Sequence, residues 1–257
     1  MIGKTKKLEG LFMRYHIMES QDIRRNLATE EYLMNHFTSE DSLFLLYIQK
    51  PSVIIGRNQN VYEEIDLNYL RENKVTLTRR ISGGGAVYDD LGNLSFSFVG
   101  PKNSIKFGDY ESIVSPILQA LKNMGAKNAK AGGRNDLYVN GMKFSGNAMY
   151  TKKNRVYSHG TLMYAVDLTI LEKILTVSKE KIESKATPSV RKAVTNIKPF
   201  LKPAFQFEKI EDFRDALICE VYHVNELKEI KEKRLDLWRN TKIYVESSNT
   251  HSQCRNR

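Results

Sequence analysis

Residues 136–166 read DLYVNGMKFSGNAMYTKKNRVYSHGTLMYAV, and this stretch decides the fold because strand patterns follow one another along it. Two apolar-rich runs, at 137–139 and 142–149, flank an Asn-Gly pair, the strongest short signal for a tight hairpin turn. A basic turn then leads to a third run at 156–165. We therefore expect three consecutive strands here, with the third pairing with the second.

Outward from this unit, capping residues and apolar residues at helical spacing predict helices at 20–37, 66–73, 110–124 and 167–177. A later helix is predicted from the spacing of Ile210, Phe213, Leu217 and Val221. Further strands are predicted at 42–49, 52–56, 76–81 and 93–98. Ser20 is the expected N-cap of the first helix. Because strands cluster between segregated helices, the expected fold class is α+β, with a mixed, largely antiparallel central sheet flanked by helices.

Composition and charge bound the class of protein. Hydrophobic residues make up 41% of the 257 residues, far too much for a disordered chain. The formal net charge of +10 favours anionic partners such as nucleotides, nucleic acid or an acidic protein. The two cysteines, Cys219 and Cys254, do not suggest a disulfide framework.

Neither a secretory signal nor a membrane span is visible in the sequence, so we expect a cytoplasmic protein. Residues 1–246 are expected to form one folded domain. The last residues, 247–257, read SSNTHSQCRNR and are polar and aperiodic, so we expect a disordered tail there.

A glycine-rich turn at 79–88 reads RRISGGGAVY. Its three consecutive glycines let the backbone approach a ligand closely, and their N–H groups can cradle phosphate oxygens beside the paired arginines. No Gly-Lys-Ser/Thr follows, and a strand rather than a helix is expected next, so this is neither a P-loop nor a Rossmann turn. From these residues alone, a flexible hairpin with a basic face remains the alternative.

The predicted strand at 142–149 carries polar residues in its middle. Strict alternation places Lys143, Ser145 and Asn147 on one face, with apolar or small residues on the other. A lysine among apolar neighbours is costly unless an anion meets it, so a phosphate or carboxylate ligand is one interpretation and a solvated outer face is the other. Just before this strand, Asn135 and Asp136 can bind a metal or ribose, or form an Asx turn.

His159 and Thr161 lie in the strand expected to pair with the Lys143 strand, so they can border the same pocket. A single histidine is more often structural than catalytic. With no nucleophilic Ser or Cys partner and no metal-spaced cluster near His159 in the sequence, neither a hydrolase triad nor a zinc site is supported.

In their order and spacing, these segments resemble the lipoate–protein ligase A family. The matching segments are RRISGGGAVY at 79–88, LGN at 91–93, GRNDL at 133–137, KFSGNA at 143–148 and HGTL at 159–162. Two further segments, NLATEE at 26–31 and VTNI at 194–197, also resemble it. Each motif is weak alone, but the ordered set is specific and covers about residues 14–230.

The resemblance implies the catalytic fold of biotin ligases and class II aminoacyl-tRNA synthetases. It implies a reaction in which lipoate attacks the α-phosphate of ATP to give lipoyl-AMP and pyrophosphate, after which a lysine of a carrier domain takes the lipoyl group as an amide. ATP and Mg²⁺ are the implied cofactors. The implied acceptors are lipoyl domains of 2-oxoacid dehydrogenase E2 subunits or the glycine-cleavage H protein. We expect a monomer that binds neither nucleic acid nor membrane.

Carried over residue by residue, the resemblance makes Lys143 the catalytic residue, reaching both the lipoyl carbonyl and the α-phosphate. The residues it implies for ATP are Arg80, Gly85, Ala86, Val87, Tyr88 and Lys143. The residues it implies for lipoate are Lys143, Ser82, Gly83, Gly84 and His159. The residues it implies for holding the adenylate are Asn135, Asp136, Ser145 and Thr161, with Asp136 also a Mg²⁺ contact.

Two features depart from the family pattern. Asp89 stands where many relatives have His, so no role is assigned to it, and the accessory domain that continues many bacterial members is not recognisable, which bears on full ligase activity. The alternatives are an octanoyl or lipoyl transferase that works without ATP, and a non-catalytic binder of lipoyl-AMP. Cysteine-using transferases are disfavoured because Cys219 falls on an apolar helix stripe and Cys254 in the tail.

Overall fold

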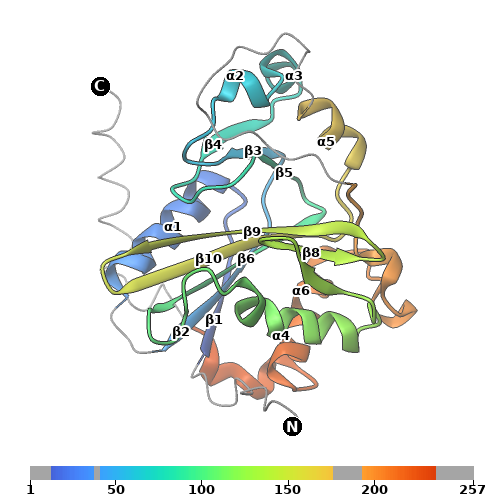
Figure 1. Ribbon diagram of the computed structural model, residues 1–257. Helices are drawn as coiled ribbons and strands as arrows, with labels where there is room; N and C mark the ends of the chain where they lie inside the picture. Colours follow the sequence, from blue (N-terminus) through green and yellow to red (C-terminus); the bar gives the residue numbers. More distant parts are fainter. Residues whose placement is uncertain (1–12, 38–40, 176–192, 236–257) are drawn as a thin grey trace.

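A seven-stranded sheet forms the centre of this computed structural model, which describes residues 13–37, 41–175 and 193–235 (Figure 1). Its strands are, in spatial order, β1 (Met13–Met18), β2 (Ser42–Tyr47), β6 (Asn93–Pro101), β10 (Arg155–Met163), β9 (Met142–Lys152), β8 (Asp136–Val139) and β7 (Lys130–Gly132). β1 and β2 run parallel, and the other neighbouring pairs in this sheet are antiparallel. The mixed, largely antiparallel sheet confirms the α+β prediction.

Helices cover both faces of the central sheet. The α-helices are, in chain order, α1 (Ile23–His36), α2 (Val61–Glu64), α3 (Leu67–Glu72), α4 (Tyr110–Asn123), α5 (Leu168–Ile174) and α6 (Ile210–Tyr222). α1 packs on one face, while α4 and α6 lie together on the other (Figure 1). Along β2, Leu45 belongs to the core beneath α1 and Leu46 to the core beneath α4 and α6. Because both faces are buried, the residues of β2 after Ser42 form a continuous hydrophobic run instead of alternating with polar ones.

A second, smaller sheet lies at the top of Figure 1. Its spatial order is β4 (Thr76–Arg79), β3 (Ser52–Ile55) and β5 (Val87–Asp89). Helices α2, α3 and α5 share a separate core cluster with it. The sequence predicted β3 and β4 as strands without assigning their partners, because the pattern of a strand does not say which strand it pairs with.

The first helix begins later than predicted. Asp22 is its N-cap, because its carboxylate accepts the backbone N–H of Arg24 at 2.9 Å. The hydroxyl of Ser20, the predicted cap, accepts instead from the N–H of Asp22 at 3.1 Å. The prediction was wrong because Ser and Asp are both good caps, and only the position of the first helical turn decides between them.

The hairpin between β9 and β10 confirms the predicted pairing of the Lys143 strand with the His159 strand, since Ala148 lies opposite His159. β9 extends three residues further than predicted, to Lys152, and β10 begins at Arg155, which leaves Lys153 and Asn154 as the turn. Lys153 has a φ of 51°, the left-handed conformation that such a short connection requires.

Short 3₁₀ helices complete the described chain: η1 (Lys198–Phe200), η2 (Pro203–Phe205) and η3 (Leu227–Lys233). The predicted helix at 167–177 is α5, and its final positions, 176–177, lie outside the described residues. The predicted tail at 247–257 also lies outside them. Across the ranges that the structure describes, no helix combines the length and apolar character needed to cross a bilayer.

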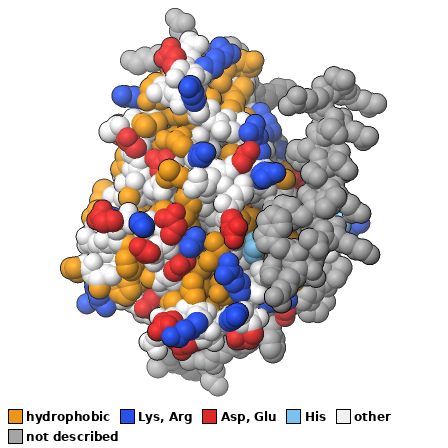
Figure 2. All heavy atoms as spheres, turned by 180° about the vertical axis from the view of Figure 1, so that it is seen from behind, with side chains coloured by type: hydrophobic (Ala, Val, Ile, Leu, Met, Phe, Trp, Pro, Cys, Tyr) orange, Lys and Arg blue, Asp and Glu red, His pale blue; other side chains and the backbone are white. Residues whose placement is uncertain are grey.

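The surface opposite to the view of Figure 1 carries basic and acidic side chains interspersed with apolar patches (Figure 2). The positive net charge is therefore not gathered into one continuous stripe on this face. A continuous basic stripe is the usual electrostatic footprint of a nucleic-acid-binding domain.

Candidate functional site

A cavity of about 340 Å³ lies between the central sheet, α1 and the glycine-rich turn. It brings together ten residues predicted for the site: Arg80, Gly84, Gly85, Ala86, Val87, Asn135, Asp136, Lys143, His159 and Thr161. The other lining residues are Leu27, Tyr47, Ile54, Asp89, Ser95, Arg134, Gly146, Asn147, Ala148 and Gly160. Segments far apart in the sequence thus converge on one space.

Four residues predicted for the site are not in the cavity lining: Ser82, Gly83, Tyr88 and Ser145. Tyr88 is buried in the core of the smaller sheet, and Ser145 is fully buried in β9. Ser82 is bonded to His159, and the carbonyl of Gly83 accepts from Arg80. In the structure these four residues therefore support the cavity from outside its lining, and their direct contact with a ligand stays a prediction.

The cavity extends across several neighbouring strands of the central sheet. Asp136 of β8 pairs with Gly146 of β9, and Ser95 of β6 pairs with Thr161 of β10 and Tyr47 of β2. All five line the cavity. Neighbouring strands lie about 4.8 Å apart, so two strand spacings, from β9 over β10 to β6, cover about 10 Å. The cavity therefore runs across the strands and suits an elongated ligand.

Lys143 and Asp136 form an ion pair near β8, with 2.9 Å between Nζ and Oδ1. The Lys143 side chain is 25% exposed and that of Asp136 only 4%. A Cβ on Gly146 would stand 3.0 Å from the Lys143 Nζ, so glycine leaves the space that the ammonium occupies. Because an ammonium has three N–H donors, Lys143 can keep this partner and bind an anionic ligand as well.

A β-bulge corrects the predicted surroundings of Lys143. The pairing of β8 with β9 shifts by one residue, which leaves Phe144 without an opposite residue. Lys143 consequently lies on the same side as Gly146, while Ser145 is fully buried beside the amide of Asn147. The predicted common face of Lys143, Ser145 and Asn147 is wrong because strict alternation ends where a residue is inserted.

Arg80 holds the glycine-rich turn together. Its guanidinium donates to the carbonyl oxygens of Ile54 at 3.0 Å, Gly83 at 2.8 Å and Gly85 at 2.6 Å. Between the latter two, Gly84 has a φ of 91°, which a side chain would oppose. Burial lowers the pKa of Arg80 to about 10, so the group remains charged at neutral pH. Arg80 thus shapes the turn and adds a buried positive charge to the cavity wall.

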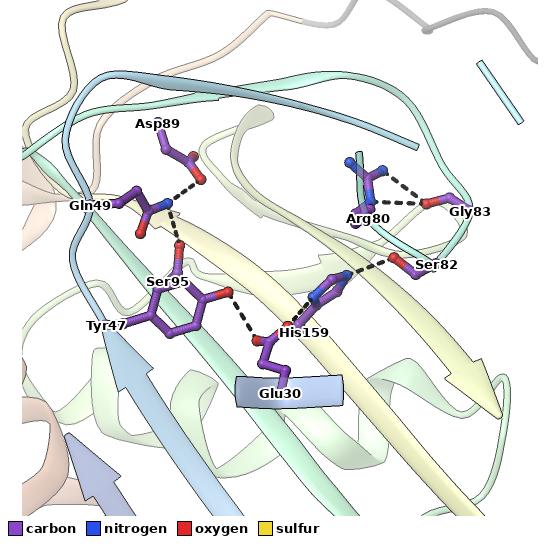
Figure 3. Close-up of polar contacts among 9 residues, drawn as sticks. All are labelled: Glu30, Tyr47, Gln49, Arg80, Ser82, Gly83, Asp89, Ser95 and His159. Carbon is purple, nitrogen blue, oxygen red and sulfur yellow. Dashed lines mark hydrogen bonds and ion pairs between the residues drawn. The ribbon is translucent and has the colours of Figure 1, made fainter. Parts of the chain in front are cut away.

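A chain of buried hydrogen bonds ties the glycine-rich turn to the sheet and to α1 (Figure 3). The Nε2 of His159 lies 2.7 Å from the hydroxyl of Ser82, and its Nδ1 lies 3.0 Å from a carboxylate oxygen of Glu30. The other oxygen of Glu30 accepts the hydroxyl of Tyr47 at 2.9 Å. With Nδ1–H donating to the carboxylate, Nε2 is left to accept from Ser82.

These contacts revise the expectation that His159 lacks a serine partner. Ser82 stands 77 residues away in the sequence, so proximity along the chain could not reveal it. Although the arrangement has the bonding order of a hydrolase triad, Ser82 is fully buried and outside the cavity lining. The chain of bonds therefore positions the turn and supplies no accessible nucleophile.

Asp89 lies at another part of the cavity wall, bonded to Gln49 and near Ser95. The Nε2 of Gln49 donates to Asp89 Oδ2 at 2.6 Å and to the hydroxyl of Ser95 at 3.0 Å (Figure 3). Burial raises the pKa of Asp89 to about 7, with the nearby Asp90 adding to the rise and the Gln49 bond opposing it. The second oxygen, Oδ1, is buried and has no hydrogen-bond partner.

No group of three or more His, Cys, Asp or Glu side chains is placed to hold a metal ion in the part of the chain that the structure describes. The carboxylates in the cavity lining are Asp89 and Asp136. Mg²⁺ commonly binds through one or two carboxylates together with substrate phosphates. The site therefore fits Mg²⁺ as an ion that arrives with a phosphate-bearing ligand.

A family model described as the lipoyl protein ligase A/B catalytic domain matches residues 22–222. The chain belongs to this family. Among curated relatives, lipoate-protein ligase LplJ of Bacillus subtilis is 42% identical over 214 residues, 83% of this chain and 63% of that protein. Lipoate–protein ligase 1 of Staphylococcus aureus is 44% identical over 206 residues, 80% of this chain and 62% of that protein. This lipoyl ligase domain thus spans less than two thirds of the length of these relatives.

Solved structures of lipoate ligases share the fold of this lipoyl ligase domain. Plasmodium falciparum LipL1 in complex with lipoate aligns with a TM-score of 0.69 and 32% identity, over 82% of this chain and 62% of that one. A bipartite lipoate protein ligase described with its E2 lipoyl domain, from Thermoplasma acidophilum, aligns with a TM-score of 0.68 and 28% identity, over 83% and 84%. A lipoate-protein ligase A bound with ATP aligns with a TM-score of 0.63 and 27% identity, over 83% and 86%.

Sequence reasoning missed half of the lining of the lipoyl ligase cavity. Leu27 and Arg134 could have been found, because each lies inside a segment that resembles the family. Tyr47 and Ile54 carried no such signal, since they belong to strands that read as ordinary core.

Proposed function

We propose that this lipoyl ligase domain activates lipoate with ATP and transfers the lipoyl group to a lysine of a carrier protein. The observation that carries the proposal is the cavity itself, which places Lys143 and Arg80 along one elongated space beside the glycine-rich turn. The lipoate- and ATP-bound relatives support the choice of these two substrates.

In the first step, a lipoate carboxylate oxygen attacks the α-phosphorus of ATP. The new O–P bond gives lipoyl-AMP, and pyrophosphate leaves with the electrons of the broken P–O bond. Two anions must meet for this step, so cations that screen their repulsion lower the barrier, most strongly where charge accumulates in the transition state. Lys143 is the lining cation best placed for this, because it is partly exposed and stands beside the space that Gly146 leaves open.

Asp136 would hold Mg²⁺ together with the phosphates of the nucleotide, and the ion would supply further neutralisation of phosphate charge. Asn135 would keep the Asp136 segment in place, since its side-chain amide donates to the carbonyl of Asn147 and the amide of Asn147 donates in return to the carbonyl of Asn135 at 3.0 Å. These reciprocal bonds join the start of β8 to β9, so the ligand-facing groups of both strands keep their spacing.

In the second step, the neutral amine of a carrier lysine attacks the lipoyl carbonyl of the adenylate. The amide N–C bond forms, the C–O bond to AMP breaks, and the amine loses one proton. Lys143 would donate a hydrogen bond to the carbonyl oxygen as negative charge develops on it. We propose lipoyl domains of 2-oxoacid dehydrogenase E2 subunits, or the glycine-cleavage H protein, as acceptors; the relative described with an E2 lipoyl domain supports the first.

The direct test is to incubate the chain with ATP, Mg²⁺ and lipoate and to measure pyrophosphate release and lipoyl-AMP. A lipoyl domain is then added, and its mass increase is measured by mass spectrometry. Adenylate and a lipoyl adduct that require all three components are expected. Adduct formation from a lipoylated donor without ATP would instead indicate a transferase, and tight binding of synthetic lipoyl-AMP without turnover would indicate a non-catalytic binder.

The cavity also bears on the transferase alternative. None of its lining residues is a cysteine, and Cys219 lies on α6 with a pKa raised mainly by burial. Such a thiol forms little thiolate at neutral pH and is a poor nucleophile. This disfavours a route through a cysteine thioester at Cys219.

A further inference from the structure

The wall of the cavity formed by β5 and β6 ends in a buried polar cluster. Gln49, Asp89 and Ser95 are each at most 2% exposed, and they are joined by the hydrogen bonds that Gln49 donates. The hydroxyl of Ser95 also accepts the amide of Asn93 at 3.1 Å. The polar cluster thus consists of Gln49, Asp89, Ser95 and Asn93, and two of these residues, Asp89 and Ser95, line the cavity.

The cluster leaves three buried acceptors without a partner, Gln49 Oε1, Asn93 Oδ1 and Asp89 Oδ1, and among these three residues Asp89 alone lines the cavity. Asp89 Oδ2 accepts from Gln49, whereas Oδ1 is buried without a partner. A buried polar atom without a partner costs free energy, and such atoms in folded proteins usually mark a place for a water, an ion or a ligand. Because Asp89 lines the cavity, a hydrogen-bond donor inside the cavity can satisfy it.

The strand order gives the distance between Asp89 Oδ1 and the part of the cavity at Lys143, where the acid is proposed to react. Lys143 is on β9, Ser95 is on β6, and β10 lies between them, so about 10 Å of cavity separates the two ends. An extended eight-carbon acid is of similar length, because each of its carbon–carbon bonds is about 1.5 Å long. With its carboxylate at Lys143, such an acid places its distal carbons beside Asp89.

Apolar side chains contribute to the cavity lining. Leu27 of α1, Ile54 of β3 and Ala148 of β9 line the cavity, and they suit the methylene chain of an acid. A donor on the distal carbons would therefore find Asp89 as a buried acceptor, and a site built to bond a donor discriminates against a ligand that lacks one.

We propose that Asp89 is a specificity-determining residue that selects an eight-carbon acid carrying hydrogen-bond donors at its distal end. The ligand form it favours is the open dithiol of lipoate, 6,8-dimercaptooctanoate, whose S–H groups can donate to Oδ1. The closed dithiolane ring and octanoate have no donor there. The inference deepens the proposed function, on which it rests for the placement of the carboxylate at Lys143.

The test measures the dissociation constants of the dithiol, of lipoate and of octanoate by calorimetry at pH 8 with the full chain and without ATP. This pH lies above the pKa of Asp89, about 7, so the carboxylate is ionised and Oδ1 can accept. The dithiol is measured with a reductant and lipoate without one, and octanoate is measured in both buffers as the common reference. We expect the wild-type chain to bind the dithiol about tenfold more tightly than either donor-free acid. Asp89→Val should reduce this preference to about one while changing octanoate binding little.

Ser97→Ala is the matched control. Ser97 lies two residues after Ser95 on β6, carries another buried hydroxyl without a partner, and is not in the cavity lining. It should keep the wild-type preference. Equal binding of the three acids by the wild-type chain would overturn the inference whether or not the Asp89→Val chain folds. Equal weakening of all acids in that variant would also overturn it, because it would indicate a structural role alone.

The outcome is separable from that of the proposed function. A preference for the dithiol without any ATP-dependent adenylate would retain Asp89 as a selector and reject the ligase. Adenylate formation from lipoate and octanoate with no advantage for the dithiol would retain the ligase and reject the role of Asp89.

Discussion

The ion pair of Lys143 with Asp136 and the bonded chain of Glu30, His159 and Ser82 are both polar groups beside the same cavity, yet they are built differently. Lys143 is partly exposed, and its ammonium has more donors than its carboxylate partner uses. The Glu30 chain is buried, and both Glu30 oxygens and both ring nitrogens of His159 are bonded. The group proposed to bind the ligand thus keeps spare bonding capacity, whereas the groups that position the turn are saturated.

The comparison is tested most strongly by Lys143→Ala. Loss of the ammonium should reduce the rate of lipoyl-AMP formation by about 10²–10³-fold, the scale of removing one group that stabilises developing charge. Because the buried Asp136 loses this ion-pair partner, the melting temperature should fall, although the chain should still fold. Pyrophosphate release and thermal unfolding are the two measurements, and a normal adenylate yield would show that the assignment of Lys143 is wrong.

Glu30→Gln tests the chain of Glu30, His159 and Ser82, in which both Glu30 oxygens and both ring nitrogens of His159 are hydrogen-bonded. The substitution keeps the size of the side chain but replaces one acceptor with a donor, so either the Tyr47 hydroxyl must turn to accept or His159 must change its tautomer. The free energy of unfolding should fall by about 1–3 kcal/mol, measured by denaturant titration. The KM for lipoate should rise more than kcat falls, because the turn is displaced rather than the reacting groups. Glu31→Gln, at an exposed position one residue away, should change neither quantity.

Gly146→Ala tests whether the space beside Lys143 matters. The added Cβ would meet the Nζ at 3.0 Å, and the flexible lysine side chain can move aside at little cost to the fold. The melting temperature should therefore stay near that of the wild type. Adenylate formation should fall by about tenfold, because a displacement of about 1 Å is enough to impair a positioned catalytic group. An unchanged rate would mean that Lys143 does not act from this position.

The pH dependence of stability gives the smallest expected effect. The folded chain holds the Asp89 proton up to about pH 7, whereas the unfolded chain releases it near 3.8. Between these values the folded state binds more protons, so this group makes stability fall as pH rises. Asp89→Asn removes that dependence. Melting curves at pH 5 and pH 8 should show the variant gaining a few degrees on the wild type at the higher pH. A difference independent of pH would argue against a raised pKa.

How much of the fold the sequence predicts can be seen in the central hairpin. The Asn-Gly turn, the strands on either side of it and the pairing with the His159 strand follow from local patterns and are confirmed. The register around Lys143 did not follow, because a bulge changes which side chains share a face without changing the composition of the strand.

The site shows the same division. The motifs that resemble the family identify Lys143, Asp136, His159 and half of the glycine-rich turn as cavity residues, because ligand contacts require particular residue types at short spacings. They do not identify Glu30 as the partner of His159, or Tyr47 and Ile54 as wall residues. Those relations join elements up to 129 residues apart, and no local pattern records them.

By itself, the sequence determined the α+β class and the family, since periodicity and short motifs are properties of neighbouring residues. Only the tertiary structure decided that the strands form two sheets, that Arg80 is committed to three carbonyl oxygens of the polypeptide, and that Asp89 keeps one buried oxygen without a partner. These facts depend on which distant groups meet once water is excluded, and the cost of burying a polar group is set by that meeting.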